Sequence, residues 1–216
     1  NDTIRGGWGN DNLTGGLGND SLFGDEDNDS LTIDSADLVI SGGTGTDTVI
    51  ANATSGSVTL NVTNALVETV SASSSTSNNR FDATGATWAV VITGGSGNDT
   101  IIGGTLADRL TGGVGNDSLV GNEGNDSLTG GLGADTFDGG ADNDSLTIDN
   151  ADINVIGGLG LDRVTVTGAT GAVNLNLTAG QIETVVASSS AFDNVFNASG
   201  ATWAVSITGG SGNDTL

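Results

Sequence analysis

The sequence contains no cysteine, histidine, lysine or tyrosine, and it has only four arginines. Without cysteine, disulfides cannot be the staple of the fold. Without His, Cys, Lys and Tyr, most nucleophiles, general bases and Schiff-base chemistry are removed, so we expect no enzyme. The remaining catalytic alternative is a pair of carboxylates acting on a glycoside, or carboxylates acting with a cation and arginine on an acidic polysaccharide. Against it, Arg5, Arg80, Arg109 and Arg163 occupy no repeated position.

Positive charge is scarce and negative charge is abundant: 27 Asp and Glu stand against four Arg, for a formal net charge of −23. Phosphate binding needs a basic surface, so nucleic acid is excluded as a partner. Anionic membranes are disfavoured for the same reason. No apolar stretch approaches the roughly 20 residues of a spanning helix, so we expect no membrane insertion. No signal peptide is recognisable and the chain opens in mid-pattern at Asn1, so we expect a piece of a longer protein.

An acidic composition of this kind often indicates disorder. Yet 35% of the residues are hydrophobic, and Val, Ile, Leu and Thr recur along the whole length. We therefore expect a folded chain whose charge is neutralised from outside, because it offers almost no cations of its own. A slender fold without disulfides needs another staple, and a metal ion is the obvious one.

A nine-residue repeat organises the glycine-rich stretches. Reading from Gly6 gives Gly-Gly-Trp-Gly-Asn-Asp-Asn-Leu-Thr, and Gly15 opens a second copy. The register skips one copy at Leu38 and another at Ile153. A flexible Gly/Asp linker is the alternative, but a linker has no reason to keep apolar residues in nine-residue phase. The aspartates at the sixth position are Asp2, Asp11, Asp20, Asp29, Asp47, Asp99, Asp108, Asp117, Asp126, Asp135, Asp144, Asp162 and Asp214.

A larger repeat encloses the small one. From Ser30 onward the two halves align without a gap at an offset of 115 residues, so that Leu31 matches Leu146. Asn-Asp-Thr-Ile at Asn1 recurs 97 residues later, at Asn98, and Asn-Asp-Thr-Leu follows 115 residues after that, at Asn213. The second interval is therefore longer by 18 residues, which is two whole nonapeptides. Lengthening a solenoid by one whole coil leaves every other contact in register. We therefore predict an all-β, right-handed parallel β-roll or β-helix solenoid with 18-residue coils. We also expect a 212-residue superrepeat that continues beyond both ends.

Each nonapeptide separates a turn from a strand. The glycines of its first six residues permit positive φ in a tight turn. Its last three residues place one large apolar side chain, such as Leu128, between polar ones, as in a short strand. Stacked coils put aspartates of neighbouring turns together, where bare carboxylates repel. A hard cation with six to eight oxygen ligands turns this repulsion into a bond, and calcium suits such carbonyl-rich sites better than magnesium. The expected pairs are Asp2–Asp20, Asp11–Asp29, Asp29–Asp47, Asp99–Asp117, Asp108–Asp126, Asp117–Asp135, Asp126–Asp144 and Asp144–Asp162.

The repeat resembles the RTX (repeat-in-toxin) calcium-binding nonapeptide family, of the surface-layer or giant-adhesin type. The resemblance covers roughly 1–50, 94–165 and 209–216. It implies several calcium ions held by the sixth-position carboxylates and by main-chain carbonyls of the first and third positions. Those positions are Gly6, Trp8, Gly15, Leu17, Gly24, Gly94, Ser96, Gly103, Thr105, Gly112, Val114, Gly121, Glu123, Gly130, Leu132, Gly139 and Ala141. Departures at 24–27, 121–124 and 105–107 predict weaker or altered sites there.

The sequence thus divides into RTX blocks at 1–50 and 94–165, a further RTX start at 209–216, and two blocks without the consensus at 51–93 and 166–208. Alternating apolar residues in the latter predict strands at 58–62, 67–70 and 88–92 and at their counterparts 173–177, 182–185 and 203–207. The 52 residues from Asp47 to Asp99 are close to three 18-residue coils, so we expect a metal-poor β-helix. A separate small β-sandwich is the alternative.

Two repeated residue pairs in these blocks have a structural and a functional interpretation. Trp88 and Trp203 are interpreted as core residues or covers of a coil edge, with sugar binding on a flat β-surface as the alternative. Glu68 and Glu183 are interpreted as solvated or capping carboxylates.

For function, we expect an extracellular structural calcium-binding module of a surface layer, adhesin or fibre. It would be secreted or lie on a bacterial cell surface, and it would fold on calcium binding after export. Its partners would be calcium ions, together with other copies or neighbouring repeats of the same long chain. The alternative is a calcium-triggered folding and secretion module of an exported enzyme or toxin.

Overall fold

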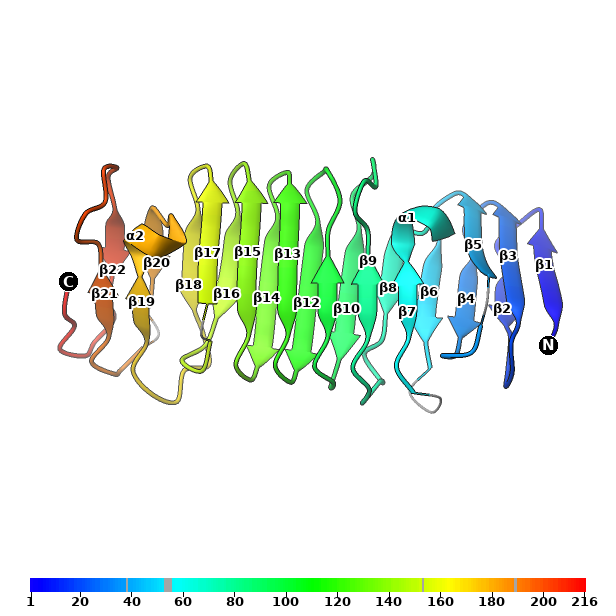
Figure 1. The fold of residues 1–216 in the computed structure, drawn as a ribbon, viewed down its shortest axis with the longest axis horizontal. Helices are drawn as coiled ribbons and strands as arrows, with labels where there is room; N and C mark the ends of the chain where they lie inside the picture. The colour runs from blue at the N-terminus through cyan, green and yellow to red at the C-terminus, as the bar shows by residue number, and fades with distance from the viewer. Residues whose placement is uncertain (38, 53–55, 153, 189) are drawn as a thin grey trace.

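The computed structural model describes residues 1–37, 39–52, 56–152, 154–188 and 190–216. Within these residues the chain winds into an elongated parallel β-solenoid whose termini lie at opposite ends (Figure 1). Odd-numbered strands line one face and even-numbered strands the other. The skipped repeat positions Leu38 and Ile153 lie outside the described residues.

The even-numbered strands form one continuous parallel sheet of eleven strands. They are β2 (Asn12–Thr14), β4 (Ser30–Ile33), β6 (Thr48–Ala51), β8 (Thr69–Ser71), β10 (Val91–Gly95), β12 (Arg109–Val114), β14 (Ser127–Leu132), β16 (Ser145–Ile148), β18 (Arg163–Val166), β20 (Thr184–Val186) and β22 (Ser206–Thr208). At about 4.8 Å between strands, this sheet runs for about 50 Å along the solenoid axis.

The odd-numbered strands form three sheets on the other face, in the order β1-β3-β5, β7 to β17, and β19-β21. They are β1 (Thr3–Gly7), β3 (Ser21–Glu26), β5 (Val39–Thr44), β7 (Thr59–Asn61), β9 (Arg80–Asp82), β11 (Thr100–Ile102), β13 (Ser118–Glu123), β15 (Thr136–Ala141), β17 (Asn154–Leu159), β19 (Asn174–Asn176) and β21 (Val195–Asn197). The helical turns α1 (Val62–Ala65) and α2 (Leu177–Gly180) follow β7 and β19, beside the two breaks in this face.

Strand pairing confirms the 18-residue coil in the glycine-rich runs, where Arg109 pairs with Ser127. Between the runs, the prediction of coils of this length is wrong. There Thr48 pairs with Thr69, and Thr69 pairs in turn with Val91, so both steps exceed two nonapeptides. The segment 51–93 therefore holds fewer and longer coils than the three that the residue count predicts. Part of the extra length is the helical turn α1, which Asn61 caps by accepting the N–H of Asn64.

The strand predictions for these segments are partly right. The strand expected at 58–62 ends at Asn61, because Val62 already begins α1. The strands β9 and β21 were not predicted at all. All of them nevertheless belong to the solenoid sheets rather than to a separate sandwich. The block boundaries themselves remain a prediction.

The core is a ladder of apolar side chains stacked from coil to coil, and some strands contribute two, such as Leu31 and Ile33 from β4. Leu110, Leu128, Leu146 and Val164 occupy it at successive coils of the long sheet, and all four are fully buried. Each such side chain contributes about 1.5–3 kcal/mol relative to an exposed one. Trp88 is partly buried against this core, and its indole N–H donates to the carbonyl of Val67 at 3.2 Å.

The glycines of the turns are required by close backbone approach. At Gly131, φ is +113° and a Cβ atom would lie 1.9 Å from the carbonyl oxygen of Gly113 one coil earlier. Where the second glycine is missing, Asp25 and Asn122 adopt the same left-handed region, with φ of 78° and 79°. Short polar side chains tolerate this conformation better than other non-glycine residues, so the turns are kept at these departures.

Candidate metal centres in the turns

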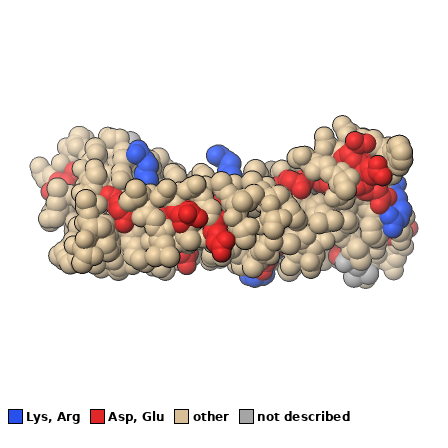
Figure 2. Space-filling model, turned by 90° about the horizontal axis from the view of Figure 1, so that it is seen from above, with Lys and Arg blue, Asp and Glu red and all other residues tan. Residues whose placement is uncertain are grey.

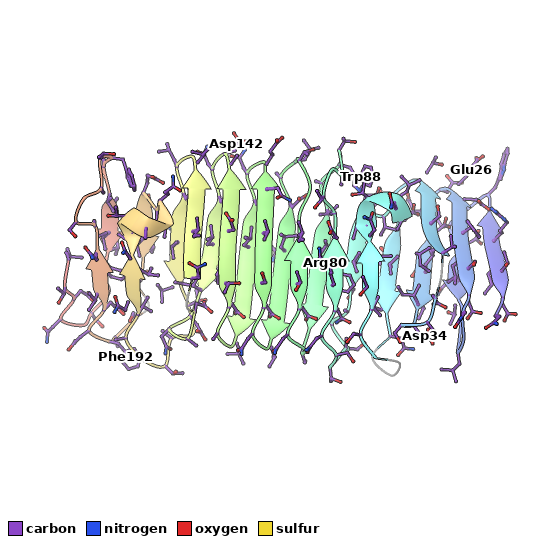
Figure 3. The ribbon with its side chains drawn as sticks, in the orientation of Figure 1. Glu26, Asp34, Arg80, Trp88, Asp142 and Phe192 are labelled. Carbon is purple, nitrogen blue, oxygen red and sulfur yellow. The ribbon has the colours of Figure 1, made fainter. Side chains whose placement is uncertain are left out.

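The turns form two rows along opposite edges of the solenoid. The upper row, as oriented in Figure 1, joins each odd-numbered strand to the next even-numbered strand. The lower row joins even to odd. Figure 3 shows Glu26, Trp88 and Asp142 along the upper edge and Asp34 and Phe192 along the lower one. Sixth-position residues Asp29 and Asp126 thus belong to the upper row, and Asp117 and Asp135 to the lower row.

In both rows one carboxylate oxygen connects adjacent coils. The N–H of Asp117 donates to Oδ1 of Asp135 at 2.8 Å, and the N–H of Asp99 donates to Oδ1 of Asp117 at 2.7 Å. The upper row repeats the contact, for example from Asp126 to Asp144 at 2.8 Å. In each of the eight predicted pairs, the later aspartate accepts the backbone N–H of the earlier one through Oδ1, so all eight pairs are brought together.

The second carboxylate oxygen of these aspartates is buried and has no hydrogen-bond partner. Within the described residues, ten Oδ2 atoms share this condition, an unusual density, because buried polar atoms normally find a partner. They belong to Asp11, Asp20, Asp29, Asp47, Asp99, Asp117, Asp126, Asp135, Asp144 and Asp162. An unpaired carboxylate oxygen in such a site is unfavourable unless a proton or a cation is beside it.

A second oxygen faces each of several such atoms. A Cβ built on Gly121 would lie 2.3 Å from Oδ2 of Asp126 and 2.3 Å from the carbonyl oxygen of Gly139 in the next coil. A Cβ on Gly94 would similarly meet Oδ2 of Asp99 at 2.4 Å and the carbonyl oxygen of Gly112 at 2.8 Å. Two acceptor oxygens thus converge beside an α-carbon that carries no side chain. This donor set fits a hard cation that prefers carboxylate and carbonyl oxygens.

Burial also changes the acidity of these groups. Desolvation raises the pKa of Asp117, Asp126 and Asp144 to about 7 each. Desolvation likewise raises the pKa of Asp99 and Asp162 above their usual value, against hydrogen bonds that lower it. These five carboxyls therefore resist ionisation until a cation replaces the lost hydration.

The predicted carbonyl ligands are placed unevenly. First-position carbonyls such as that of Gly139 lie beside an unpaired Oδ2. The third-position carbonyl of Leu132 accepts the N–H of Gly115, and the role of third positions as ligands remains a prediction. In the part of the chain that the structure describes, no group of three or more His, Cys, Asp or Glu side chains converges closely enough to hold a metal. Acidic side chains alone therefore do not complete a site in these rows, and the further ligands of an ion would come from the main chain or from water.

Three of the predicted aspartates differ from the rest. Oδ2 of Asp108 accepts the N–H of Gly104, so this carboxylate is satisfied, in keeping with the altered repeat at 105–107. Asp2 is exposed in the first coil. Oδ1 of Asp214 accepts both the backbone N–H and the side-chain amide of Asn194.

Sequence reasoning missed two aspartates that continue the lower row. The N–H of Asp20 donates to Oδ1 of Asp37, and the N–H of Asp135 donates to Oδ1 of Asp152. Both lie one residue before the skipped register position. Their second oxygens accept the N–H of Asp34 and of Asp149, respectively, so a tighter turn replaces the nonapeptide. The offset of 115 residues between the two could have revealed them.

Glu68 and Glu183 end the aspartate chains of the upper row. Oε2 of Glu68 accepts the N–H of Asp47 at 2.7 Å, and Oε2 of Glu183 accepts that of Asp162 at 2.8 Å. They are half-buried. Their interpretation as capping carboxylates agrees with these contacts.

A ladder of fifth-position asparagines was also missed. The N–H of Asn116 donates to Oδ1 of Asn98 at 2.8 Å, and the N–H of Ala134 donates to Oδ1 of Asn116 at 2.8 Å. These bonds run from a later coil to an earlier one, opposite to those of the aspartates. The turns are thus connected by neutral contacts on the outside and by carboxylates inside.

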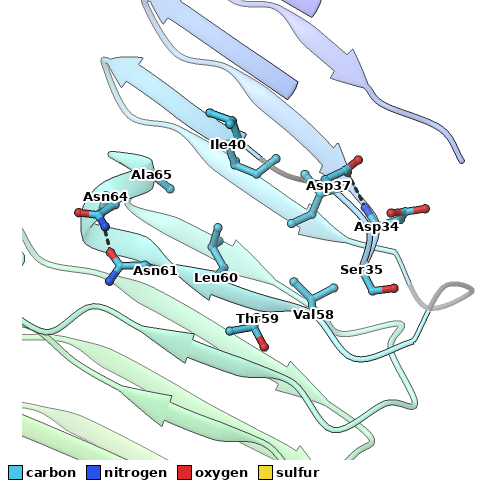
Figure 4. A pocket seen from close by; sticks show the side chains of 12 residues that line it. Asp34, Ser35, Asp37, Ile40, Val58, Thr59, Leu60, Asn61, Asn64 and Ala65 are labelled. Carbon is cyan, nitrogen blue, oxygen red and sulfur yellow. Dashed lines mark hydrogen bonds between the residues drawn. The ribbon is translucent and has the colours of Figure 1, made fainter. Parts of the chain in front are cut away.

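Two grooves lie at the breaks in the odd-numbered face. The first, of about 310 Å³, is lined by the apolar Ile40, Leu60 and Val58 and by polar residues such as Asp37 and Asn61 (Figure 4). The second, of about 250 Å³, is lined by residues 115 positions later, including Asp152, Val155 and Leu175. Each lies next to a helical turn.

The surface carries fewer charges than the composition suggests. On the face shown in Figure 2, acidic atoms are scattered among uncharged ones, and they gather at one end beside a basic side chain. At that end Arg5 and Asp25 form an ion pair at 2.8 Å. Much of the acidic charge lies instead in the buried turn rows.

The fold and the turn rows define a class of protein, a parallel β-solenoid whose stacked turns present unpaired carboxylate and carbonyl oxygens to cations. A family model of the RTX calcium-binding nonapeptide repeat matches four copies in the chain, at residues 1–32, 89–110, 111–146 and 205–216. These matches cover somewhat less than half of the chain; repeats of this family bind Ca²⁺, and the aspartates along the coils fit several calcium sites. Among curated proteins no match was found. In the described residues no helix is both long and apolar enough to cross a membrane.

Bound calcium would supply the positive charge that the paired oxygens lack. The residues that would hold it are the ten aspartates with an unpaired Oδ2 and the first-position carbonyls beside them. The chain's own part is to keep one carboxylate oxygen fixed by a backbone N–H, so that the other is oriented toward the neighbouring coil.

Proposed function

We propose that this chain is an extracellular structural module, a piece of the body of a surface layer, adhesin or fibre, that folds and stiffens on binding calcium after export. The observation that carries the proposal is the set of ten buried carboxylate oxygens without a partner, distributed along both edges of one rod. A module of this kind acts as a spacer whose stiffness depends on the ion. Its role is mechanical and not catalytic.

The energetics support folding coupled to calcium. The core is one side chain thick, so its burial opposes the conformational entropy of the chain only narrowly. Unpaired buried carboxylates oppose folding further. An ion that binds only the folded state adds stability that grows with its free concentration, by about 4 kcal/mol at 1,000 times the Kd. A chain that is unfolded where calcium is scarce and folded where it is abundant suits export, and RTX-repeat proteins are typically secreted.

Tandem construction favours the structural role over a secretion module of an exported enzyme. The halves repeat at an offset of 115 residues, and α1, α2 and both grooves recur with them. Enzymes can carry RTX repeats as well, so the sequence of the whole parent protein discriminates the two. A catalytic domain with no further copies of the long repeat would favour the secretion module.

The test combines far-ultraviolet circular dichroism with small-angle X-ray scattering during a calcium titration of the 216-residue chain. The expected result is an expanded chain with disordered aspartate runs in calcium-free buffer, and a rod of about 50 Å with strong β-signal in millimolar calcium. Magnesium at equal ionic strength is the control. A β-rich rod that persists unchanged with a strong chelator would refute calcium-coupled folding. Antibody labelling of intact cells tests the location, and sedimentation with and without calcium tests self-association.

A further inference from the structure

Two buried asparagines occupy the sixth position of the turn in the segments without the RTX consensus. They are Asn79 and Asn194, which are 115 residues apart in the lower row. Both are buried, with 3% and 0% of their surface exposed. Like the aspartates, each accepts a backbone N–H of the preceding coil through Oδ1: Val58 donates to Asn79, and Val173 donates to Asn194. In the backbone pattern these turns are therefore equivalent to the aspartate turns.

The second side-chain atom differs in its chemistry. Nδ2 of Asn79 donates to the carbonyl oxygen of Gly94 in the next coil at 3.1 Å and to Oγ of Ser75 at 3.2 Å. Nδ2 of Asn194 donates to the carbonyl oxygen of Gly209 at 3.0 Å and to Oγ of Ser190 at 3.2 Å. Gly94 and Gly209 are first-position glycines. In the aspartate turns, the equivalent carbonyl faces an unpaired Oδ2.

We propose that Asn79 and Asn194 do with a side-chain amide what calcium does in the aspartate turns, so that the coils holding them stay closed without calcium. In an aspartate turn, two acceptor oxygens face each other and need a cation between them. In an asparagine turn, an N–H donor replaces one acceptor, and the same two atoms attract each other directly. The chain thus contains a metal-free version of its own calcium site.

Each of the two asparagines lies one coil before an aspartate turn, where it is placed to guide calcium-driven folding. Asn79 lies one coil before Asp99, the first aspartate of the long RTX run, and its N–H donates to Oδ1 of Asp99 at 2.6 Å. Asn194 stands in the same relation to Asp214. A coil that is already closed presents this N–H in place to the first calcium-dependent turn. Calcium-driven folding therefore extends from these coils into the aspartate runs. This inference rests on the calcium-coupled folding proposed above.

The experiment is hydrogen exchange with mass spectrometry on the whole 216-residue chain, with calcium and with a chelator, combined with a count of bound calcium. In the wild type, amides of the coil around Asn79 stay protected in chelator while those between Asp99 and Asp162 exchange. Asn79→Asp loses this protection in chelator by on the order of tenfold to a hundredfold, regains it in calcium, and binds one more ion. Asn78→Asp is the matched control, because it adds the same charge one residue away on an exposed side chain that only accepts a hydrogen bond.

Equal protection of wild type, Asn79→Asp and Asn78→Asp in chelator would overturn the inference. So would exchange of the wild-type coil around Asn79 together with the aspartate run, which would leave calcium-coupled folding intact. Protection of the aspartate run itself in chelator would contradict both this inference and calcium-coupled folding. If Asn79→Asp does not fold even in calcium, the reverse substitution, Asp117→Asn, tests the inference instead. It should bind one ion fewer and gain protection in chelator, and a variant that loses the ion without gaining protection contradicts the amide's role.

Discussion

Protons should replace calcium in the turn rows, so the calcium-free chain should fold on acidification. Burial raises the pKa of Asp117, Asp126, Asp144 and Asp152 from 3.8 to about 7 each. The folded state without calcium therefore holds protons that the unfolded state has already released. Its stability is fully present below the unfolded pKa of about 3.8 and is lost as the pH rises through about 7.

The magnitude is large for so slender a fold. One pKa unit corresponds to about 1.4 kcal/mol, so ionising one of these carboxyls in the folded chain costs about 4 kcal/mol before screening. Screening by solvent and neighbouring dipoles reduces this to roughly 2 kcal/mol per group. Four groups then cost about 8 kcal/mol, which is comparable with the whole stability of an ordinary domain.

The assay is circular dichroism of resin-stripped, calcium-free protein from about pH 8 to about pH 5, with the melting temperature followed at each pH. We expect β-signal to grow as the pH falls. In saturating calcium the slope should reverse, because protons then compete with the ion for the same oxygens. A calcium-free chain that gains structure toward high pH, or has the same slope in both conditions, would refute the reasoning.

Gly121→Ala should abolish one calcium site, because its methyl group would occupy the point where the sixth-position carboxylate and the next coil's glycine carbonyl converge. Isothermal titration calorimetry should show one ion fewer for this variant. Gly171→Ala is the control and should bind as many ions as the wild type, since the nearest atom to its methyl group would be 3.3 Å away. Leu128→Ala should lower the free energy of unfolding in calcium by about 2–5 kcal/mol in denaturant titrations, since the side chain is fully buried. Leu132→Ala, at a side chain that is 61% exposed, should change it little, and equal losses would contradict the assigned strand register. Glu183→Ala should cost about 1–3 kcal/mol by leaving a backbone N–H at the end of the upper row without its acceptor. A melting temperature equal to that of the wild type would show that the cap is dispensable.

The coil register was predictable because the inward apolar residues and the turn aspartates repeat with the same nine-residue spacing. The apolar residue at the eighth position of each repeat, such as Leu119 or Leu128, must point inward, and the aspartate two residues earlier must then lie in the turn. The insertion of two whole nonapeptides in the second half fixed the coil length. These signals are local and repeated, so they survive single departures such as Asn122.

The same counting failed where the chain leaves the nonapeptide. Strict nine-residue steps point to Leu38, while the row is continued by Asp37, because a turn closed by Asp34 shortens the path. The four-residue helix α1 has no periodicity to detect, and it makes its coil longer than two nonapeptides. One carboxylate oxygen accepts a backbone N–H and the other stays unpaired. Which oxygen does which depends on the offset between neighbouring coils, and no pattern within one repeat encodes that offset.

The two ladders of hydrogen bonds give the rod a direction. In the nonapeptide runs, a coil offers aspartate N–H groups and asparagine side-chain oxygens to the coil that follows, and it offers carboxylate oxygens and fifth-position N–H groups to the coil that precedes. The two ends of any segment are therefore complementary to each other and not to themselves. Segments can be joined end to end only with the chains running the same way, since reversing one would set acceptors against acceptors and donors against donors.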